Sequence, residues 1–364
     1  MDLEFTEEQE LLRETARRIC DASFDSSMVR ALESQESGFN RPFWNALSEA
    51  GLCGVRIAEA HEGAELGSLE MAILFEEFGR ALASSPYLPS CVHAAAILAS
   101  SAGNLANDWL RLIATSEAAV IPAWVEDDLG LAGAPEPALL ESGHLSGTKL
   151  LVPFAHNADA FLVHACSGDG HCWVMVPKDA EGLALTHQAN HAAQPLYEVV
   201  FNKVVITDEH TIPASADPTH DKVFDDVLIA TAAEAVGAAS SLLELTCRYA
   251  NERQQFGRPI AAFQAISHPL AECATELEAA RYLTYQAAWA KDEGTACTKL
   301  ARMAKVAATA MFRRLATVAV QVHGGIGYAK EGEPQLYYRR SKHLELTYGT
   351  AANLRSAIAA DILD

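Results

Sequence analysis

The sequence contains no apolar run of the ~18 residues that a membrane-spanning helix requires. Its first residues, MDLEFTEEQELL, begin a helical pattern and lack the basic and then apolar composition of a secretory leader. Cysteine occurs at eight positions, but without a C-x-x-C pair or the spacing typical of a zinc site. We therefore expect a cytoplasmic protein with no membrane span, whose thiols are reduced and buried.

Positive charge is also scarce. The chain has 27 Lys and Arg against 48 Asp and Glu, a formal net charge of −21, and no local basic patch. Such a surface repels nucleic acid, so a nucleic-acid partner is not expected. The 13 histidines show no H-E-x-x-H or paired spacing, and no G-x-S-x-G elbow is present. These absences argue against a metal site and against a serine nucleophile of the hydrolase type.

The 364 residues, half of them hydrophobic, are enough for two or three domains with a large core. Thr6 and Gln9 form a capping-box pattern that predicts a helix over 6–21, and helical periodicity continues to about 116. Short β-rich runs separated by Gly, Asn, Asp and Pro then predict a small β-barrel or sandwich. Ala-rich stretches predict a closing helix bundle, at about 222–251, 262–293, 295–322 and 350–363. We expect an α+β chain with domains at 1–118, 119–216 and 217–364.

A helix break separates two of the later helical stretches and carries two arginines, in Arg253-Gln-Gln-Phe256-Gly257-Arg258-Pro259. The guanidinium groups of Arg253 and Arg258 are suited to gripping phosphate or carboxylate, and Phe256 is suited to packing on a ring. A plain turn with solvated arginines explains the residues equally well.

A second glycine-rich segment, Gln321-Val-His323-Gly324-Gly325-Ile-Gly327-Tyr328, also follows a long helix. Glycines permit close backbone approach and can present amides to an anion such as a pyrophosphate. A glycine-rich helix C-cap is the ordinary alternative, and the absence of a preceding strand excludes a Rossmann fingerprint. A single histidine beside glycines is most often a structural hydrogen-bonding group.

Together, the α–β–α order, RQQFGRPIAAFQ, VQVHGGIGY and TYGTAANLR resemble the acyl-CoA dehydrogenase family of flavoproteins, from residue 3 to residue 363. The resemblance implies a helical domain, a middle β-domain and a C-terminal four-helix bundle. It also implies FAD, an acyl-CoA substrate and electron-transferring flavoprotein as acceptor. FAD lies between subunits in this family, and the residues that would clamp the neighbour's pyrophosphate and adenosine are Arg253, Phe256, Gln264, Gln321, Gly324 and Gly325.

The family's catalytic base is missing from both of its usual positions. The C-terminal motif Y-E-G-T reads Thr347-Tyr348-Gly349-Thr350, and a phenol with a pKa of ~10 is a poor base at neutral pH. The alternative position, ten residues before Gly237, holds Val227. Asp226 is the remaining candidate base. The acidic first turn of a helix is the favoured alternative for Asp225 and Asp226, because an aspartate side chain reaches less far than glutamate.

The middle domain departs from the family pattern as well. T-E-P-x-A-G-S-D reads Val125-Glu126-Asp-Asp-Leu-Gly-Leu-Ala132, and W-I-T reads Leu151-Val152-Pro153. Val125 and Leu151 have no polar side-chain atom, and Pro153 has no amide hydrogen. We therefore expect this chain to lack several of the hydrogen-bonding groups that would hold its own flavin ring.

The residues that a subunit contributes to its neighbour's FAD site are kept, whereas the residues that it needs for its own flavin ring and its own base are absent. This pattern predicts the non-catalytic subunit of an α₂β₂ enzyme, such as those that resemble this family and act on bulky steroid or side-chain acyl-CoA thioesters. The alternatives are a self-sufficient homotetramer or flavin oxidase with Asp226 as base, and a catalytically silent acyl-CoA-binding scaffold. A DNA-associated flavoprotein is disfavoured by the charge.

Overall fold

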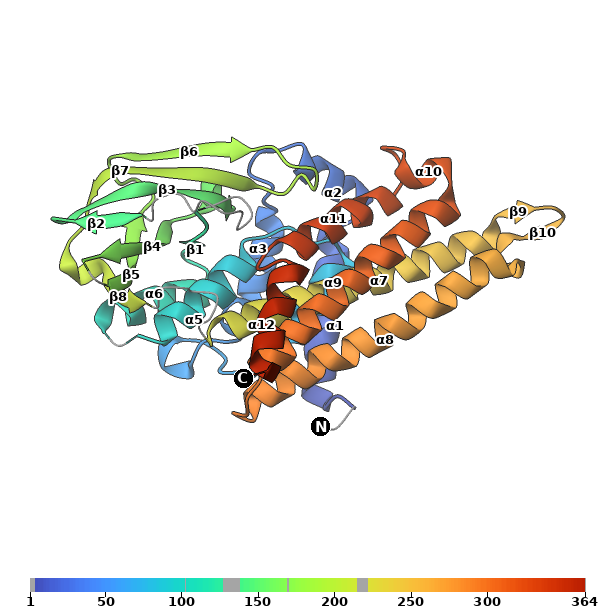
Figure 1. Cartoon of the computed structure of the whole chain (residues 1–364), viewed down its shortest axis with the longest axis horizontal. Coiled ribbons are helices and arrows are strands. Elements are labelled where there is room, and N and C mark those ends of the chain that lie inside the picture. The colour runs from blue at the N-terminus through green and yellow to red at the C-terminus, as the bar shows by residue number, and fades with distance from the viewer. Residues whose placement is uncertain (1–3, 102, 127–137, 169, 215–221, 364) are drawn as a thin grey trace. The chain divides into compact units, whose positions relative to one another are not determined.

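The computed structural model describes residues 4–101, 103–126, 138–168, 170–214 and 222–363, which form two compact units (Figure 1). The first unit joins Met1–Val29, Gly67–Ala83 and Asp225–Asp364. The second unit joins Arg30–Leu66 and Ser84–Phe224. The expected order of helices, sheet and helices along the chain is confirmed. The three-domain division stays a prediction, and its second boundary lies outside the described residues.

The first unit is helical. Its helices are α1 (Glu7–Ser23), α4 (Ser68–Arg80), α7 (Phe224–Glu252), α8 (Gln264–Asp292), α9 (Thr298–His323), the one-turn α10 (Gly325–Tyr328), α11 (Pro334–Leu346) and α12 (Ala351–Leu363). The four Ala-rich stretches correspond to α7, α8, α9 and α12. Sequence reasoning missed α11, because its residues PQLYYRRSKHLEL contain no alanine and few apolar side chains.

Two helix starts in this unit are capped in different ways. At α1 the predicted capping box is present, since Gln9 N–H donates to Thr6 Oγ1 (3.2 Å) and Thr6 N–H donates to Gln9 Oε1 (3.0 Å). Helix α4 is preceded by Gly67, which has no side chain to act as a cap. A carboxylate far away in the sequence takes this role. Asp292, at the end of α8, accepts hydrogen bonds from the backbone N–H groups of Ser68 (2.6 Å) and Leu69 (3.0 Å).

Helix α7 is the core helix of this unit. It is long and apolar enough to cross a membrane by length and composition, but 83% of its most apolar window is buried within the structure. Burial of that kind is typical of a central helix in a folded domain. The structure therefore gives no support for a membrane span here.

Helices α4 and α7 cross at two glycines. A Cβ atom built on Gly237 would lie 1.8 Å from the carbonyl oxygen of Glu76, and one built on Gly79 would lie 2.0 Å from that of Glu234. Both neighbours are helix backbone, which cannot move aside as a flexible side chain can. The crossing therefore requires glycine on both helices.

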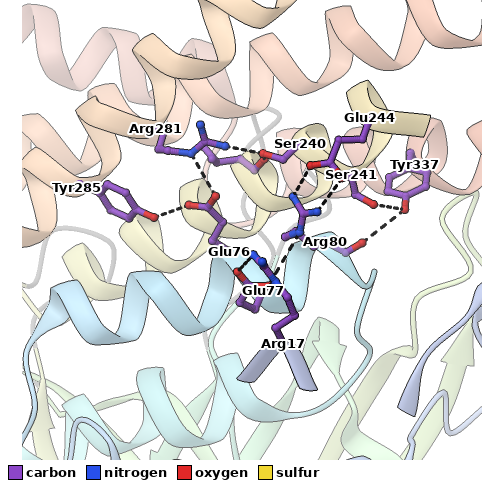
Figure 2. A network of polar contacts seen from close by, with 11 residues as sticks. Arg17, Glu76, Glu77, Arg80, Ser240, Ser241, Glu244, Arg281, Tyr285 and Tyr337 are labelled. Carbon is purple, nitrogen blue, oxygen red and sulfur yellow. Dashed lines mark hydrogen bonds and ion pairs between the residues drawn. The ribbon is translucent and has the colours of Figure 1, made fainter. Parts of the chain in front are cut away.

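A network of polar side chains holds α1, α4 and α7 together (Figure 2). The Glu77 side chain is only 2% exposed and accepts two hydrogen bonds from Arg17, at Nε (2.8 Å) and Nη2 (2.6 Å). Arg80 lies 4.0 Å from Glu77 and donates through both terminal nitrogens to Glu244 (3.0 and 2.9 Å). Bidentate geometry of this kind gives arginine pairs their strength.

Glu76, the residue before Glu77 on α4, extends the network to α8. The Glu76 carboxylate accepts hydrogen bonds from Arg281 Nε (3.1 Å) and from the Tyr285 hydroxyl (2.5 Å). Arg281 also donates to Ser240 Oγ on α7 (2.7 Å), as Figure 2 shows. Consecutive carboxylates on α4 thus connect three other helices of the unit.

Replacing Arg17 with glutamine should lower the free energy of unfolding by about 2 kcal/mol, because the buried Glu77 carboxylate would lose its main cationic partner. Arg13→Gln is the matched control, since Arg13 and its partner Glu10 are both more than a third exposed. The control should cost less than about 1 kcal/mol. Urea unfolding followed by circular dichroism measures both, and equal losses would contradict a structural role for the Glu77 network.

The second unit carries the sheet and the remaining helices. The helices are α2 (Ser26–Glu33), α3 (Arg41–Glu49), α5 (Ala95–Ala99) and α6 (Asn104–Ala114), with a π-helical segment at Leu88–Ala94. The strands are β1 (Val120–Ala123), β2 (Leu139–Glu141), β3 (His144–Pro153), β4 (Ala160–Ser167), β5 (Gly170–Pro177), β6 (Leu183–Gln188), β7 (Leu196–Val205) and β8 (Thr211–Ala214).

These strands form one mixed sheet in the order β6-β7-β3-β2-β4-β5-β8, with β1 pairing parallel to β4. Its apolar face builds a core that includes Phe161, Val163, Val174, Val199 and Phe201. Buried positions alternate over the middle of β7, whereas β4 and β5 are buried almost continuously, as in strands covered on both faces. The β-rich texture of the middle third is thus confirmed as a sheet.

Candidate cofactor-binding site

The first motif forms a small β-hairpin at the end of α7. The chain leaves α7 at Arg253, pairs β9 (Gln254–Gln255) with β10 (Arg258–Pro259), and enters α8 at Gln264. The two turn residues, Phe256 (φ 52°) and Gly257 (φ 78°), both have positive φ, as in a type I′ turn. Ile260 N–H donates to the Arg253 carbonyl (2.9 Å) and closes the base of the hairpin.

Phe256 is the unusual residue of this turn. Type I′ turns favour Asn or Gly at its position, and a bulky side chain there costs about 1–3 kcal/mol of backbone strain. The ring gains little from packing, because it is 90% exposed. An exposed aromatic ring held in a strained backbone suits a group that contacts something outside the chain.

The second motif ends α9 and starts α10. Gly324 has φ 62°, and its N–H donates to the carbonyls of Val320 (3.0 Å) and Gln321 (3.3 Å). The amide of Gly324 therefore caps α9, as the ordinary alternative for this segment predicts. At both Gly324 and Gly325 an added Cβ atom would meet nothing within 4 Å, so the backbone can be approached closely from outside.

The two motifs lie at the same end of the helical unit. An apolar cluster of Ala250, Leu270 and Val322 joins the ends of α7, α8 and α9, and Ile260 of the hairpin segment packs on it. Figure 1 shows the β9–β10 hairpin and α10 at this end. The two segments at this end carry the six predicted clamp residues, which are Arg253, Phe256, Gln264, Gln321, Gly324 and Gly325.

His323 has a structural role beside these residues, as expected. Its Nδ1 donates to the Ala319 carbonyl (2.8 Å), and its ring stacks on Tyr249 at 4.2 Å between centroids. Burial lowers the pKa of His323 below its ordinary value. The ring is therefore neutral at physiological pH and holds α7 against α9.

Comparisons with known proteins identify the family of the chain. Residues 6–117 match the acyl-CoA dehydrogenase N-terminal domain, and residues 222–363 match the acyl-CoA dehydrogenase C-terminal domain. Benzylmalonyl-CoA dehydrogenase of Aromatoleum aromaticum is 30% identical over 387 residues, covering 100% of both chains. The chain belongs to the acyl-CoA dehydrogenase family. This is a family of oxidoreductases.

Two solved structures of this family are also similar over nearly their whole length. One is the ChsE4-ChsE5 complex from Mycobacterium tuberculosis, with a TM-score of 0.91, 26% identity and coverage of 100% of this chain and 99% of that one. The other is a steroid ACAD variant, Tcur3481-Tcur3483, with a TM-score of 0.88, 31% identity and 98% coverage of both chains.

Tyr348, which the family resemblance predicts at the position of the base, lies in the turn between α11 and α12. Its backbone has φ 55°, and the following Gly349 has φ 98°. Burial, and to a smaller extent the Glu234 carboxylate, raise the pKa of the Tyr348 phenol well above its usual value. The phenol is therefore protonated at neutral pH and cannot take a proton from a substrate.

A buried lysine that sequence reasoning missed holds this turn. Lys305 on α9 is fully buried, and its Nζ donates to the backbone carbonyls of Glu345 (3.0 Å) and Gly349 (2.5 Å). Burial lowers the pKa of Lys305 to about 8. The lysine lies within an Ala-rich helix whose pattern predicts only packing, so no local signal pointed to it.

Both aspartates at the start of α7 are engaged within the helical unit. Asp226 accepts a hydrogen bond from Ser68 Oγ (2.8 Å) and pairs with Lys291 Nζ (3.3 Å). Asp225 accepts from Thr298 Oγ1 (2.9 Å) and Cys297 Sγ (3.2 Å). Val227, which the resemblance predicts at the family's alternative base position, is fully buried. These contacts favour a structural role for Asp226 over that of a base.

The altered positions of the middle domain also have partners of their own. Leu151 N–H donates to Gln188 Oε1 (2.9 Å), and the Val125 carbonyl accepts from Leu150 N–H (2.8 Å). Glu126 pairs with the fully buried Lys149. Residues 127–132 of the altered segment lie outside the described residues. The backbone groups described here are therefore committed to the sheet.

An apolar groove lies along the outside of the bundle. It has a volume of about 640 Å³ and is lined by α8 and α9, through residues that include Ala279, Leu283, Ala307, Ala310, Met311 and Val318. Apolar concavities of this kind on a folded unit are typical of surfaces that another chain covers.

Proposed function

We propose that this chain is a non-catalytic subunit of an FAD-dependent acyl-CoA dehydrogenase and completes the FAD site of a paralogous partner. The observation that carries the proposal is the exposed end of the bundle, which bears the strained and 90% exposed Phe256, the exposed Arg253 and the open backbone of Gly324 and Gly325. All of these groups are exposed on the surface of their own chain. They suit a ligand held mainly by a neighbouring subunit.

The residues present fit the pyrophosphate and adenosine half of FAD. The Arg253 guanidinium would pair with the pyrophosphate, and the Phe256 ring would pack on an apolar face of the cofactor. Gly325 would allow the backbone to approach the phosphates. Gln264 and Gln321 are both exposed at this end and supply amide donors and acceptors. When bound, FAD accepts the hydride from the β-carbon of the acyl thioester.

In this proposal the chain lacks the catalytic base that an active site of its own would need. Proton abstraction from the α-carbon needs a base near neutral pKa, and the Tyr348 phenol is protonated. Asp226 is engaged by Ser68 and Lys291. The partner subunit therefore supplies both the base and the cradle of the flavin ring.

The relatives support the kind of partner and substrate. The ChsE4-ChsE5 structure is a complex of two differently named chains, and the Tcur3481-Tcur3483 enzyme is a steroid ACAD. We infer an α₂β₂ assembly in the cytoplasm that acts on a steroid or side-chain acyl-CoA, as in β-oxidation. The apolar α8–α9 groove supports association with other chains. Electron-transferring flavoprotein is the proposed acceptor, since a Caffeyl-CoA reductase-Etf complex subunit of Acetobacterium woodii is 27% identical.

The chain should be colourless when purified alone and should carry flavin when co-purified with its paralogue, and only the complex should bleach on addition of acyl-CoA. Arg253→Ala should raise the Kd of the complex for FAD by about ten- to hundredfold, because it removes a charge-assisted contact to phosphate. Arg248→Ala, an exposed arginine five residues earlier on α7, is the matched control and should leave flavin content unchanged.

Two results would contradict the proposal. Flavin retained and bleached by the single chain would make it self-sufficient, and an unchanged FAD content in the Arg253→Ala complex would make it a scaffold. Asp226→Asn should leave turnover of the complex within about twofold, whereas loss of a true base costs about 10²–10⁴ in rate. Thermal unfolding verifies that each variant is folded.

A further inference from the structure

We propose that Arg258 and Phe263 are positioning residues that hold Phe256 in place for the cofactor, so that only Arg253 of the two hairpin arginines meets phosphate. This inference rests on the proposed function, because it concerns the same FAD-binding hairpin. It assigns the second arginine a role that differs from the anion grip expected from the sequence.

The contacts of Arg258 are the first observation. Its guanidinium carbon lies 4.3 Å from the centroid of the Phe263 ring, the geometry of a cation–π contact. The guanidinium is thus directed at a ring of its own chain. Opposite it on the hairpin, Arg258 is in register with Gln255, the residue before the turn.

Phe263 links Arg258 to Phe256 in the turn. Its ring centroid lies 5.9 Å from that of Phe256 with the planes at 82°, an edge-to-face contact. The three side chains therefore form a stack in the order Arg258, Phe263, Phe256. Phe256 receives from this stack the orientation that its exposed turn does not otherwise provide.

The base of the stack is well anchored. Phe263 directly precedes α8, its N–H donates to the Ile260 carbonyl (3.1 Å), and its carbonyl accepts from the N–H groups of Ile266 (2.9 Å) and Ser267 (3.0 Å). A residue held on both backbone sides at a helix start is a rigid support. Phe256 has φ 52°, so it needs such a support to stay in one conformation.

The test measures the Kd for FAD of the reconstituted apo complex by flavin fluorescence, with this chain as wild type or variant. Arg258→Gln should weaken FAD binding about two- to fivefold, and Arg258→Lys should restore most of the affinity because it keeps the cation over the ring. Phe263→Leu should weaken binding at least as much. Thermal unfolding should change little in all three, since the hairpin is exposed.

A double-variant cycle separates positioning from direct phosphate contact. If Arg258 acts through the Phe263 ring, Arg258→Gln should have no further effect in the Phe263→Leu background. Full additivity of the two losses, or no loss from Arg258→Gln, would overturn the inference. Arg253→Ala serves as the reference: if it also leaves the Kd unchanged, the proposed function itself is wrong, whereas a weakened Arg253→Ala complex confines the failure to Arg258 and Phe263.

Discussion

Replacing Gly237 with alanine should prevent stable folding of this chain. The new Cβ atom would lie 1.8 Å from the Glu76 carbonyl oxygen and 2.6 Å from the carbonyl carbon, so α4 and α7 would have to separate. Separation would also disturb Gly79, which approaches the Glu234 carbonyl in the same crossing. Ordinary overpacking costs 1–3 kcal/mol, and we expect a loss above about 4 kcal/mol here because both contacts are backbone.

The matched control for this variant is Gly325→Ala. Gly325 also lies in a helix, but an added Cβ atom would meet nothing within 4 Å there. Circular dichroism with temperature should show a cooperative transition near that of the wild type for Gly325→Ala and a much lowered or absent transition for Gly237→Ala. Equal transition temperatures in the two variants would show that the crossing can relax.

The stability conferred by Lys305 should depend on pH in a definite direction. Burial lowers the pKa of Lys305 from 10.5 to about 8 in the folded chain. Between these values the unfolded chain binds a proton that the folded chain does not, so the free energy of unfolding rises with pH. Relative to Lys305→Met, the wild type should gain about 3 kcal/mol between pH 8 and 10.5 and show a constant difference below pH 8.

Urea unfolding of both proteins at several pH values measures this difference directly. Taking the difference removes the contribution of other groups that titrate in the same range, provided the variant keeps the fold. The charged neighbours of the site include Glu345, which favours the ammonium form of Lys305, and Arg313, which pairs with Glu345 (3.1 Å). A difference that stays flat up to pH 10.5 would mean that the pKa of Lys305 is the same in the folded and the unfolded chain, so that burial does not lower it.

The same lysine connects stability with the proposed division of labour. Lys305 holds the carbonyls on both sides of the Tyr348 turn, so the turn that the resemblance predicts for the family's base is fixed although the Tyr348 phenol is protonated. In the proposed non-catalytic subunit the backbone of this turn is thus held in place without a base. This is what a subunit needs when it must still pack against a catalytic partner.

Much of the fold and of the candidate site could be predicted from local patterns. The capping box at Thr6 and Gln9, the helix break at Gly257, and the glycine-rich end of α9 depend on residues within a few positions of one another. Backbone preferences and hydrogen bonds at helix ends are local, so a sequence displays them directly. Helix α11 escaped prediction because its buried residues are mixed with charged ones.

By itself the sequence determined the order of helices and strands, the two motifs of the acyl-CoA dehydrogenase family, and the loss of a carboxylate at Tyr348. Only the tertiary structure decided that Asp292 caps α4 and that Lys305 holds the Tyr348 turn. The first set depends on neighbours along the chain. In the second set, the partner of each charged side chain depends on which helices and turns pack together. Composition and spacing do not predict this packing.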